Sequence, residues 1–226
     1  MKVLYEDNHI IVVNKQAGEI VQGDKTGDTP LSETLKAFIA QRDGKPGKVF
    51  MGVPHRLDRP VSGVSMFAKT SKSLERLNEM FRTAQVHKTY WALCCNAPQD
   101  APSTGEEGTL LENWLLRNEK QNKSFIVKPG TKDAKLAKLR YRVTGHSDRY
   151  HLIEVELLTG RHHQIRCQLA GIGCPIKGDL KYGAPRSNRN GGICLMARSI
   201  SFNHPVRHEQ ITVQAGVPED WPPVEL

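Results

Sequence analysis

The chain has 226 residues, of which 38% are hydrophobic and 25% are charged, a composition typical of a folded globular protein and not of a disordered one. Its 32 Lys and Arg residues outnumber its 24 Asp and Glu residues, and the net charge of +8 fits a nucleic-acid partner and a merely basic protein equally well. The length suits one large domain or two small lobes that share a sheet, and we expect a single domain over residues 1–226.

The cysteines and the N-terminus indicate a reducing, aqueous compartment. The five cysteines are odd in number and none has C-x-x-C spacing, which argues against a disulfide framework and a zinc site. No apolar run approaches the roughly 18 residues of a membrane span, and MKVLYEDNH brings in two acids where a secretion signal has an apolar core. We therefore expect a cytoplasmic protein with no membrane partner.

The first third of the chain predicts a hairpin and two helices. Two β-rich runs flank the polar turn at residues 6–9. Thr29 before Pro30 predicts a helix N-cap, and the apolar spacing that follows predicts an amphipathic helix with Leu31, Leu35, Phe38 and Ile39 on its buried face. After the loop 42–48, residues 63–70 predict a strand, and a second apolar stripe predicts a helix containing Leu74, Leu77, Met80, Phe81 and Ala84.

The second half is richer in strands. Apolar and polar residues alternate around residues 139–143 and 153–157, which is typical of antiparallel strands with one buried face, and 193–202 and 210–214 are two further strand candidates. We expect an α+β fold with a mixed, mainly antiparallel central sheet and flanking helices, and not a doubly wound parallel sheet. No Gly-rich phosphate loop is present, which argues against a nucleotide cofactor.

The stretch HRLDRPVSG, residues 55–63, places Asp58 between Arg56 and Arg59. If the segment is strand-like, Arg56 and Asp58 share a face and Arg59 points away. A nearby guanidinium keeps a carboxylate ionised, and an ionised, shielded carboxylate can act as a nucleophile or a base. The residues alone favour the simpler interpretation, a structural Asp–Arg pair.

A second group of polar residues lies in TGRHHQIRCQLAGIGCPIKGDLKYG, residues 159–183. Arg161 and Arg166 flank Gln164, and Ile165 and Leu169 mark a helix that two nearby glycines close. The helix start is a natural anion site, although a basic surface helix explains the same residues. The adjacent histidines His162 and His163 and Cys167 lack the carboxylates and spacing of a metal site.

Three stretches together resemble one family. HRLDRPVSG is similar to the HRLD-R-x-x-SG signature of the RluA family of RNA pseudouridine synthases, the 159–183 segment to its GR-x-HQIR…G-x-PI-x-GD-x-x-YG segment, and HKTYWAL at residues 87–93 to its K-x-Y-x-A segment. Their order and spacing agree, and the resemblance extends from about residue 3 to about residue 214. The departures are modest: Gln16 replaces a usual Pro, Pro60 and Val61 a frequent Asp-Thr, and Cys174 a common His.

The resemblance implies a pseudouridine synthase-like catalytic fold that isomerises uridine in ribosomal RNA or transfer RNA without a cofactor. It makes Asp58 the essential catalytic residue, Arg166 the partner that holds Asp58 ionised, Arg161 a second such candidate or a phosphate contact, and Tyr90 the active-site tyrosine that stacks on uracil or helps remove its carbon 5 proton. Asp58 would attack the sugar or the base, or take a sugar proton. We also expect a monomer without the separate N-terminal RNA-binding domain that some relatives carry.

The target base must leave the RNA helix to be reached. By resemblance Arg56 fills the space it leaves, since a planar guanidinium can stack and form hydrogen bonds in place of a base, while Ser62 and Gly63 turn the chain into the next strand. His55 and Gln164 complete the expected substrate-binding set. The Lys- and Arg-rich segment 117–142 and the loop 184–192 are candidate phosphate contacts. The alternative for each is a solvated charged face, which is the better explanation for any single residue.

Two other functions remain open at this stage. One is a non-catalytic RNA-binding protein that keeps the fold. The other is a metal-independent ribonuclease that uses His55, His162 or His163 as general acid and base.

Overall fold

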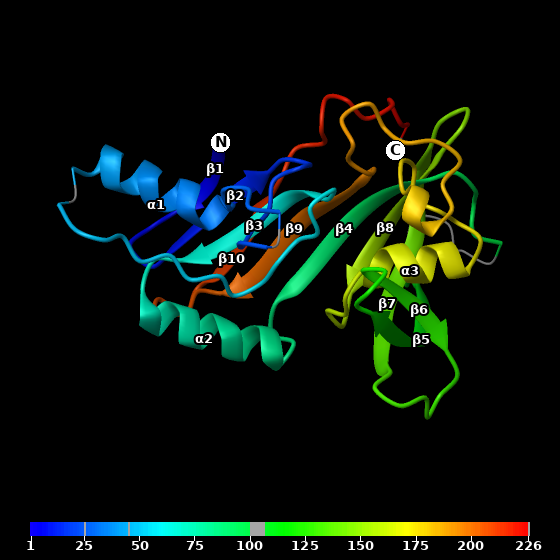
Figure 1. Ribbon diagram of the computed structural model, residues 1–226, viewed down its shortest axis with the longest axis horizontal. Helices are drawn as coiled ribbons and strands as arrows, with labels where there is room; N and C mark the ends of the chain where they lie inside the picture. Colours follow the sequence, from blue (N-terminus) through cyan, green and yellow to red (C-terminus); the bar gives the residue numbers. More distant parts are fainter. Residues whose placement is uncertain (25, 45, 100–106, 226) are drawn as a thin grey trace. The chain divides into compact units, whose positions relative to one another are not determined.

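The computed structural model describes residues 1–24, 26–44, 46–99 and 107–225, and the chain forms two compact units (Figure 1). The first unit comprises Met1–His87 and Ala197–Gly216, and the second comprises Lys88–Met196 and Val217–Leu226. Every strand pairing with a determined register is antiparallel, and helices accompany both sets of strands. The predicted α+β class with a mainly antiparallel sheet is therefore confirmed.

The first unit contains β1 (Lys2–Glu6), β2 (Ile10–Lys15), β3 (Ser62–Ala68), most of β9 (Leu195–Asn203) and β10 (Gln210–Gln214), with α1 (Leu31–Arg42) and α2 (Ser71–Arg82). The strand order is β1-β2-β3-β9, and β10 pairs with β9. Strand β3 is buried at every position and β2 at all but one, as in strands covered on both faces. The predicted hairpin, strand and two helices are confirmed.

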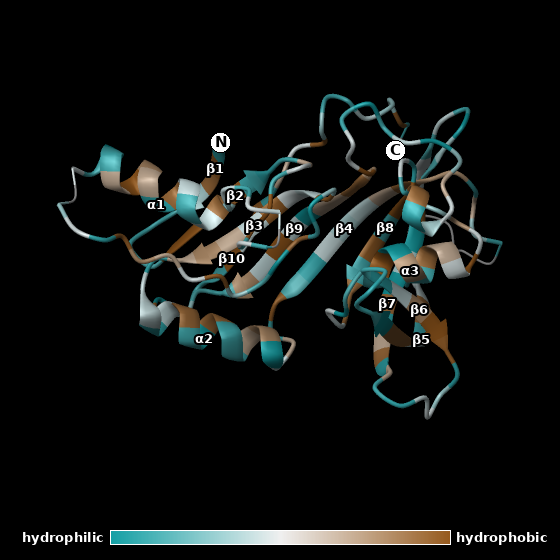
Figure 2. Cartoon of the chain, viewed as in Figure 1, coloured by the Kyte–Doolittle hydropathy of each residue, from teal (hydrophilic) through white to brown (hydrophobic). Residues whose placement is uncertain are grey.

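Two details of the predicted helices are wrong. Pro30, and not Thr29, is the N-cap of α1, and it offers no side-chain cap. Instead the Leu31 N–H donates to the Ile20 carbonyl at 2.7 Å, so a neighbouring backbone segment satisfies the helix start. Helix α2 ends at Arg82, and Ala84 lies beyond it with a left-handed φ of 56°, outside the apolar stripe to which its spacing assigned it. Figure 2 shows hydrophilic and hydrophobic residues alternating along α2.

The second unit contains β4 (His87–Cys94), β5 (Thr109–Asn118), β6 (Lys123–Val127), β7 (Lys135–His146) and β8 (His151–Leu157), with α3 (Gln164–Gly171) and the short 3₁₀ helix η1 (Leu180–Tyr182). The strands run in the order β4-β8-β7-β5-β6 and pair antiparallel throughout. The predicted strands β7 to β10 and the helix α3 are confirmed. Strands β5 and β6 were not predicted, because their sequences lack a clear two-residue alternation.

Gly63, the last residue of HRLDRPVSG, has a positional reason for being glycine. Its φ is +107°, in a region that L side chains rarely adopt. A Cβ atom there would overlap the backbone carbonyl of Ala197 and lie 2.7 Å from its nitrogen. The Ser-Gly at the end of the stretch therefore allows β3 to begin in close contact with the backbone of β9.

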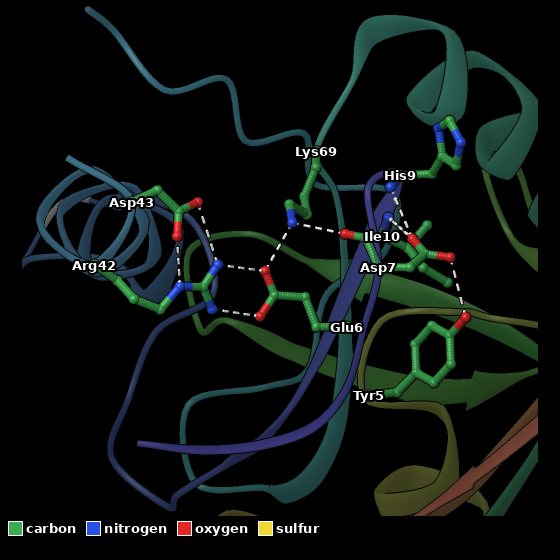
Figure 3. A network of polar contacts seen from close by, with 8 residues as sticks. All are labelled: Tyr5, Glu6, Asp7, His9, Ile10, Arg42, Asp43 and Lys69. Carbon is green, nitrogen blue, oxygen red and sulfur yellow. Dashed lines mark hydrogen bonds and ion pairs between the residues drawn. The ribbon is translucent and has the colours of Figure 1, made fainter. Parts of the chain in front are cut away.

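A network of charged side chains ties the β1–β2 turn to α1 and to the end of β3 (Figure 3). The Glu6 carboxylate accepts two hydrogen bonds from Arg42, at 2.6 and 2.9 Å, and one from Lys69 at 2.7 Å. Asp7 closes the turn, because its Oδ1 accepts from the backbone N–H groups of His9 and Ile10 at 2.7 and 2.9 Å. The Arg42 hydrogen bonds, opposed by burial and assisted by Lys69, lower the pKa of Glu6 to about 2.

Among the described residues, no helix is both long enough and apolar enough to cross a membrane.

The Glu6 network predicts a pH-dependent stability. Since the folded pKa of Glu6 is about 2 and its ordinary value is 4.5, its contribution is present above pH 4.5 and is lost as the pH falls towards 2. Replacing Glu6→Gln should lower the free energy of unfolding at pH 7 by about 1–2 kcal/mol, after allowance for solvent screening. Urea denaturation at several pH values measures this, and the gap to the native protein should close at acidic pH.

The matched control is Glu33→Gln. Glu33 forms a solvent-exposed pair with Lys36 at 2.7 Å, and such a pair contributes about 0.5 kcal/mol or less. A Glu6→Gln effect that stays constant across the pH range would contradict the assignment.

Candidate active site

The segment that carries Asp58 is an irregular loop and not a strand. Residues 53–58 have no regular secondary structure, and residues 59–60 form a turn just before β3. The Val61 N–H donates to the Asp58 carbonyl at 3.0 Å, which closes the turn. Within this loop Leu57 is buried, Asp58 is half-buried and Arg56 is exposed. Arg56 and Asp58 therefore do not share the face of a strand, as the sequence had predicted for a strand-like segment.

The Arg59 side chain contacts the segment after β2. Its guanidinium pairs with Asp28, and its Nε donates to the Gly18 carbonyl at 3.2 Å. The Gly18 N–H in turn donates to the Arg59 carbonyl at 2.8 Å. Of the two arginines that flank Asp58, Arg59 serves the fold and Arg56 extends into solvent.

The loop is held by the ammonium group of Lys15, at the end of β2. Lys15 is 0% exposed, and its Nζ donates to the carbonyls of Asp58 at 3.2 Å, Arg59 at 3.1 Å and Val61 at 2.6 Å. A fourth bond, to its neighbour Gln16, measures 3.1 Å. One buried cation therefore fixes the backbone from Asp58 to Val61. Sequence reasoning missed Lys15, since nothing local to a lysine in a hydrophobic strand reveals which carbonyls it will meet.

Burial lowers the pKa of Lys15 to about 8, and the negative charges of Glu19 and Asp58 oppose that shift. At neutral pH the group is therefore still mostly protonated. The protonated form is also the one that offers three N–H donors to the carbonyls around it.

His55 contributes to the packing of the same region. Its Nε2 accepts from the Met66 N–H at 2.9 Å, and its ring stacks on Phe81 with centroids 4.9 Å apart. A ring nitrogen that accepts from buried backbone is poorly placed to deliver or take a substrate proton. Substrate binding by His55 stays a prediction.

In the second unit, Arg166 lies in α3 and is locked by a carboxylate. Its Nε and Nη2 donate to the two oxygens of Asp179 at 2.7 and 2.9 Å, and the two side chains are only 5% and 1% exposed. The Arg166 guanidinium also lies 5.1 Å from the ring centroid of Tyr182. A bidentate, buried pair fixes the plane of a guanidinium, and it therefore sets the direction in which its outer edge points. Asp179 and Tyr182 belong to the GDLKYG run, but sequence reasoning gave neither a role.

The two histidines before α3 are structural. His163 has a left-handed φ of 51°, stacks on His162 with centroids 3.8 Å apart, and its Nδ1 lies 3.1 Å from the Tyr182 hydroxyl. Burial, assisted by the charge of Arg166, lowers the pKa of His163 to about 2. His162 contacts the Ser124 hydroxyl at 2.9 Å and the Asn122 side chain at 3.0 Å. His163 therefore stays neutral at physiological pH and cannot serve as a general acid.

Gln164 and Arg161 hold the turn that leads into α3. The Gln164 Oε1 accepts from the Thr159 hydroxyl at 2.8 Å and from the Arg161 N–H at 3.0 Å, and its Nε2 donates to the Lys138 carbonyl at 3.0 Å. Arg161 donates from Nε to the Leu136 carbonyl at 2.9 Å, and its side chain is exposed. Contacts of either residue with a substrate stay predictions.

Tyr90 lies on β4, opposite Val155 of β8, and is buried.

Burial raises the pKa of each of the five thiols, and all five cysteines are free of disulfides. Within the described ranges no cluster of His, Cys, Asp or Glu has the geometry of a metal site.

Comparison with known proteins gives a consistent result. Residues 9–171 match the family model described as RNA pseudouridylate synthase. The chain is 30% identical to tRNA pseudouridine synthase C of Salmonella typhi, over 98% of this chain and 87% of that protein. It is 33% identical to ribosomal large subunit pseudouridine synthase D of Xylella fastidiosa, over 97% of this chain and 67% of that protein.

Among solved structures, human RNA pseudouridylate synthase domain containing 4 matches with a TM-score of 0.79 at 24% identity, over 96% of this chain and 89% of that chain. This likeness confirms the fold that the sequence motifs implied.

The Lys15 contacts predict that Lys15→Met loosens the Asp58 loop. Methionine has similar length but no donors, so the buried carbonyls lose their partner, and the free energy of unfolding should fall by about 2–4 kcal/mol. Hydrogen exchange of the Val61 and Gly18 amides should accelerate. Lys72→Met, on the exposed face of α2, is the control. Native-like exchange at Val61 in Lys15→Met would show that the loop is held by something else.

Proposed function

This chain belongs to the RNA pseudouridylate synthase family, and we propose that it isomerises specific uridines of transfer RNA or ribosomal RNA with Asp58 as its catalytic carboxylate. The two relatives named above are a transfer RNA enzyme and a ribosomal large-subunit enzyme. The net charge of +8 suits a polyanionic substrate. Cytoplasm is the proposed location and a monomer the proposed state.

The reaction is an isomerisation. The bond between N1 of uracil and C1′ of ribose breaks, the base turns, and a bond between C5 and C1′ forms. C5 loses its proton and N1 gains one, so the number of protons is unchanged. No electrons enter or leave, so the balance needs no oxidant, reductant or nucleotide.

The observation that carries the assignment of Asp58 is its support. The carboxylate is half-buried on a loop whose backbone carbonyls at Asp58, Arg59 and Val61 all bind one buried ammonium. A catalytic group must be held to within a fraction of an ångström, and rigid backbone support of this kind is what such a group requires. Three roles fit the carboxylate: attack on the sugar, attack on the base, or removal of a sugar proton.

Arg166 and Tyr90 complete the proposed catalytic set. Arg166 is assigned as the cation that keeps Asp58 ionised, and its rigid pairing with Asp179 supports a positioning role of that kind. Tyr90 is assigned to the uracil, on which its ring would stack. Arg56, exposed on the same loop as Asp58, is assigned to the space that the flipped base leaves in the RNA.

The ribonuclease alternative loses support from the histidines. His163 is held neutral, and the Nε2 of His55 accepts from a strand backbone. A pseudouridine map of total RNA from cells with and without this gene distinguishes an enzyme from a non-catalytic RNA-binding protein. Loss of a pseudouridine without the gene indicates the enzyme and identifies its target uridine, whereas an unchanged map indicates a binding protein.

We predict that Asp58→Asn lowers pseudouridine formation by at least about a hundredfold, because the amide is nearly isosteric but is neither a base nor a nucleophile. RNA affinity and thermal stability should stay close to native. Carbodiimide labelling of treated RNA, read by mass spectrometry, measures the product. Asp148→Asn, an exposed residue in the second unit, is the control, and native turnover by Asp58→Asn would refute the role.

We predict that Arg56→Ala and Lys128→Ala fail differently. Loss of Arg56 should slow the single-turnover rate at saturating enzyme more than it weakens binding. Loss of Lys128, a candidate phosphate contact, should weaken the binding of many different RNAs by a similar factor. It should also reduce the magnitude of the slope of log binding constant against log salt concentration by roughly 0.7–0.9. An Arg56→Ala enzyme with an unchanged saturated rate and that reduced salt slope would make Arg56 one more phosphate contact.

A further inference from the structure

An open cleft in the second unit lies where β6 meets α3 and η1. Its volume is about 400 Å³, and its lining includes Lys123, Phe125, Ile126, Cys167 and Tyr182. The floor is buried, whereas Phe125 and Ile126 at the rim are 38% and 41% exposed. None of the sequence motifs includes Phe125 or Ile126, and the proposed catalytic set does not use them.

The rim is rigid. Strand β6 is hydrogen-bonded along its length to β5. On its other side, the Ser124 N–H donates to the Tyr182 hydroxyl at 2.8 Å, and the Cys167 thiol donates to the Ser124 carbonyl at 3.3 Å. Gly171 of α3 packs so closely on Ile126 that a Cβ atom would overlap its side chain. An exposed aromatic ring on such a support needs no rearrangement of the backbone to bind, so only its side-chain torsions remain to be ordered.

The cleft is also positively charged. The Lys123 ammonium lies 5.4 Å from the ring centroid of Phe125 and 5.0 Å from that of Tyr182, and no carboxylate in the described part of the chain pairs with it. Residues 117–128, which form β6 and its approach, contain four Lys or Arg residues and one acid. An apolar ring beside an ammonium group that pairs with no carboxylate is complementary to a nucleotide, which has a flat base and an anionic phosphate.

Tyr182 connects the cleft to the proposed catalytic set. Its ring lines the cleft, and the Arg166 guanidinium lies 5.1 Å from its centroid. A ligand on the Tyr182 ring in the cleft is therefore one side chain away from Arg166, the residue assigned to keep Asp58 ionised. This proximity favours a part of the substrate RNA over a protein partner.

We propose that the cleft is a second nucleotide site, in which an unpaired base of the substrate RNA stacks on Phe125 while Lys123 contacts its phosphate. The inference rests on the proposed function, because it takes the RNA substrate as given. It adds a contact outside the pocket for the target uridine, and it assigns to β6 a part in substrate choice, since a base that is paired cannot stack there.

The test compares Phe125→Leu, Phe125→Tyr and the native enzyme. Leucine keeps an apolar surface without a π face, whereas tyrosine keeps the ring. Affinity for bulk transfer RNA and for a short fluorescein-labelled oligouridylate is measured by anisotropy. Phe125→Leu should weaken binding by about fivefold to about a hundredfold, the range for loss of one base stack, and Phe125→Tyr should bind as the native enzyme does. Leu110→Ala, exposed on β5, is the control and should bind normally.

Native affinity of Phe125→Leu for both RNAs would overturn the inference. So would a concentration-dependent dimer that Phe125→Leu abolishes in sedimentation, because the rim would then bind a second copy of the chain. These readouts do not depend on catalysis. If the native enzyme forms no pseudouridine but its RNA affinity still depends on the Phe125 ring, the proposed function fails and the stacking site stands.

Discussion

A single buried ammonium group organises the loop that carries Asp58. Lys15 is withdrawn from water at the end of β2, and four backbone carbonyls replace its hydration shell. A buried charge is tolerated only when its hydrogen-bonding capacity is used internally, and the same requirement obliges the loop to keep one backbone arrangement. The backbone of residues 58–61, which belongs to no strand or helix, is held by this constraint. The loop enters β3 at Gly63, opposite Lys15 in the strand register.

The second unit also contains a buried cation, but a carboxylate, and not a set of backbone carbonyls, accepts its hydrogen bonds. Arg166 and Asp179 are almost fully buried, and two hydrogen bonds join them. Tyr182 and the stacked pair His162 and His163 enclose them. Buried polar groups that complete one another in this way specify geometry more than they add stability.

The polar residues thus divide into two sets. One set is buried and committed to the fold: Lys15, Asp179, His163 and Gln164. The other set is exposed at the surface, and it includes Arg56 and Arg161. For an enzyme that binds a large polyanion, this division is physically reasonable, because substrate contacts must be exposed whereas the groups that aim them must not move.

The sequence by itself determined the α+β class, most of the strands and helices, the family and the identity of the motif residues. These follow from local periodicity and from short motifs, which are properties of neighbouring residues along the chain. It failed for the N-cap of α1, because the donors there are satisfied by the Ile20 and Val21 carbonyls, and for β5 and β6, whose sequences lack a clear two-residue alternation. Only the tertiary structure decided that Lys15 holds the Asp58 loop, that Asp179 holds Arg166 and that Arg59 turns to Asp28. Each of these contacts joins residues at least 13 positions apart, and no local pattern records which buried charge will meet which acceptor once the strands have packed.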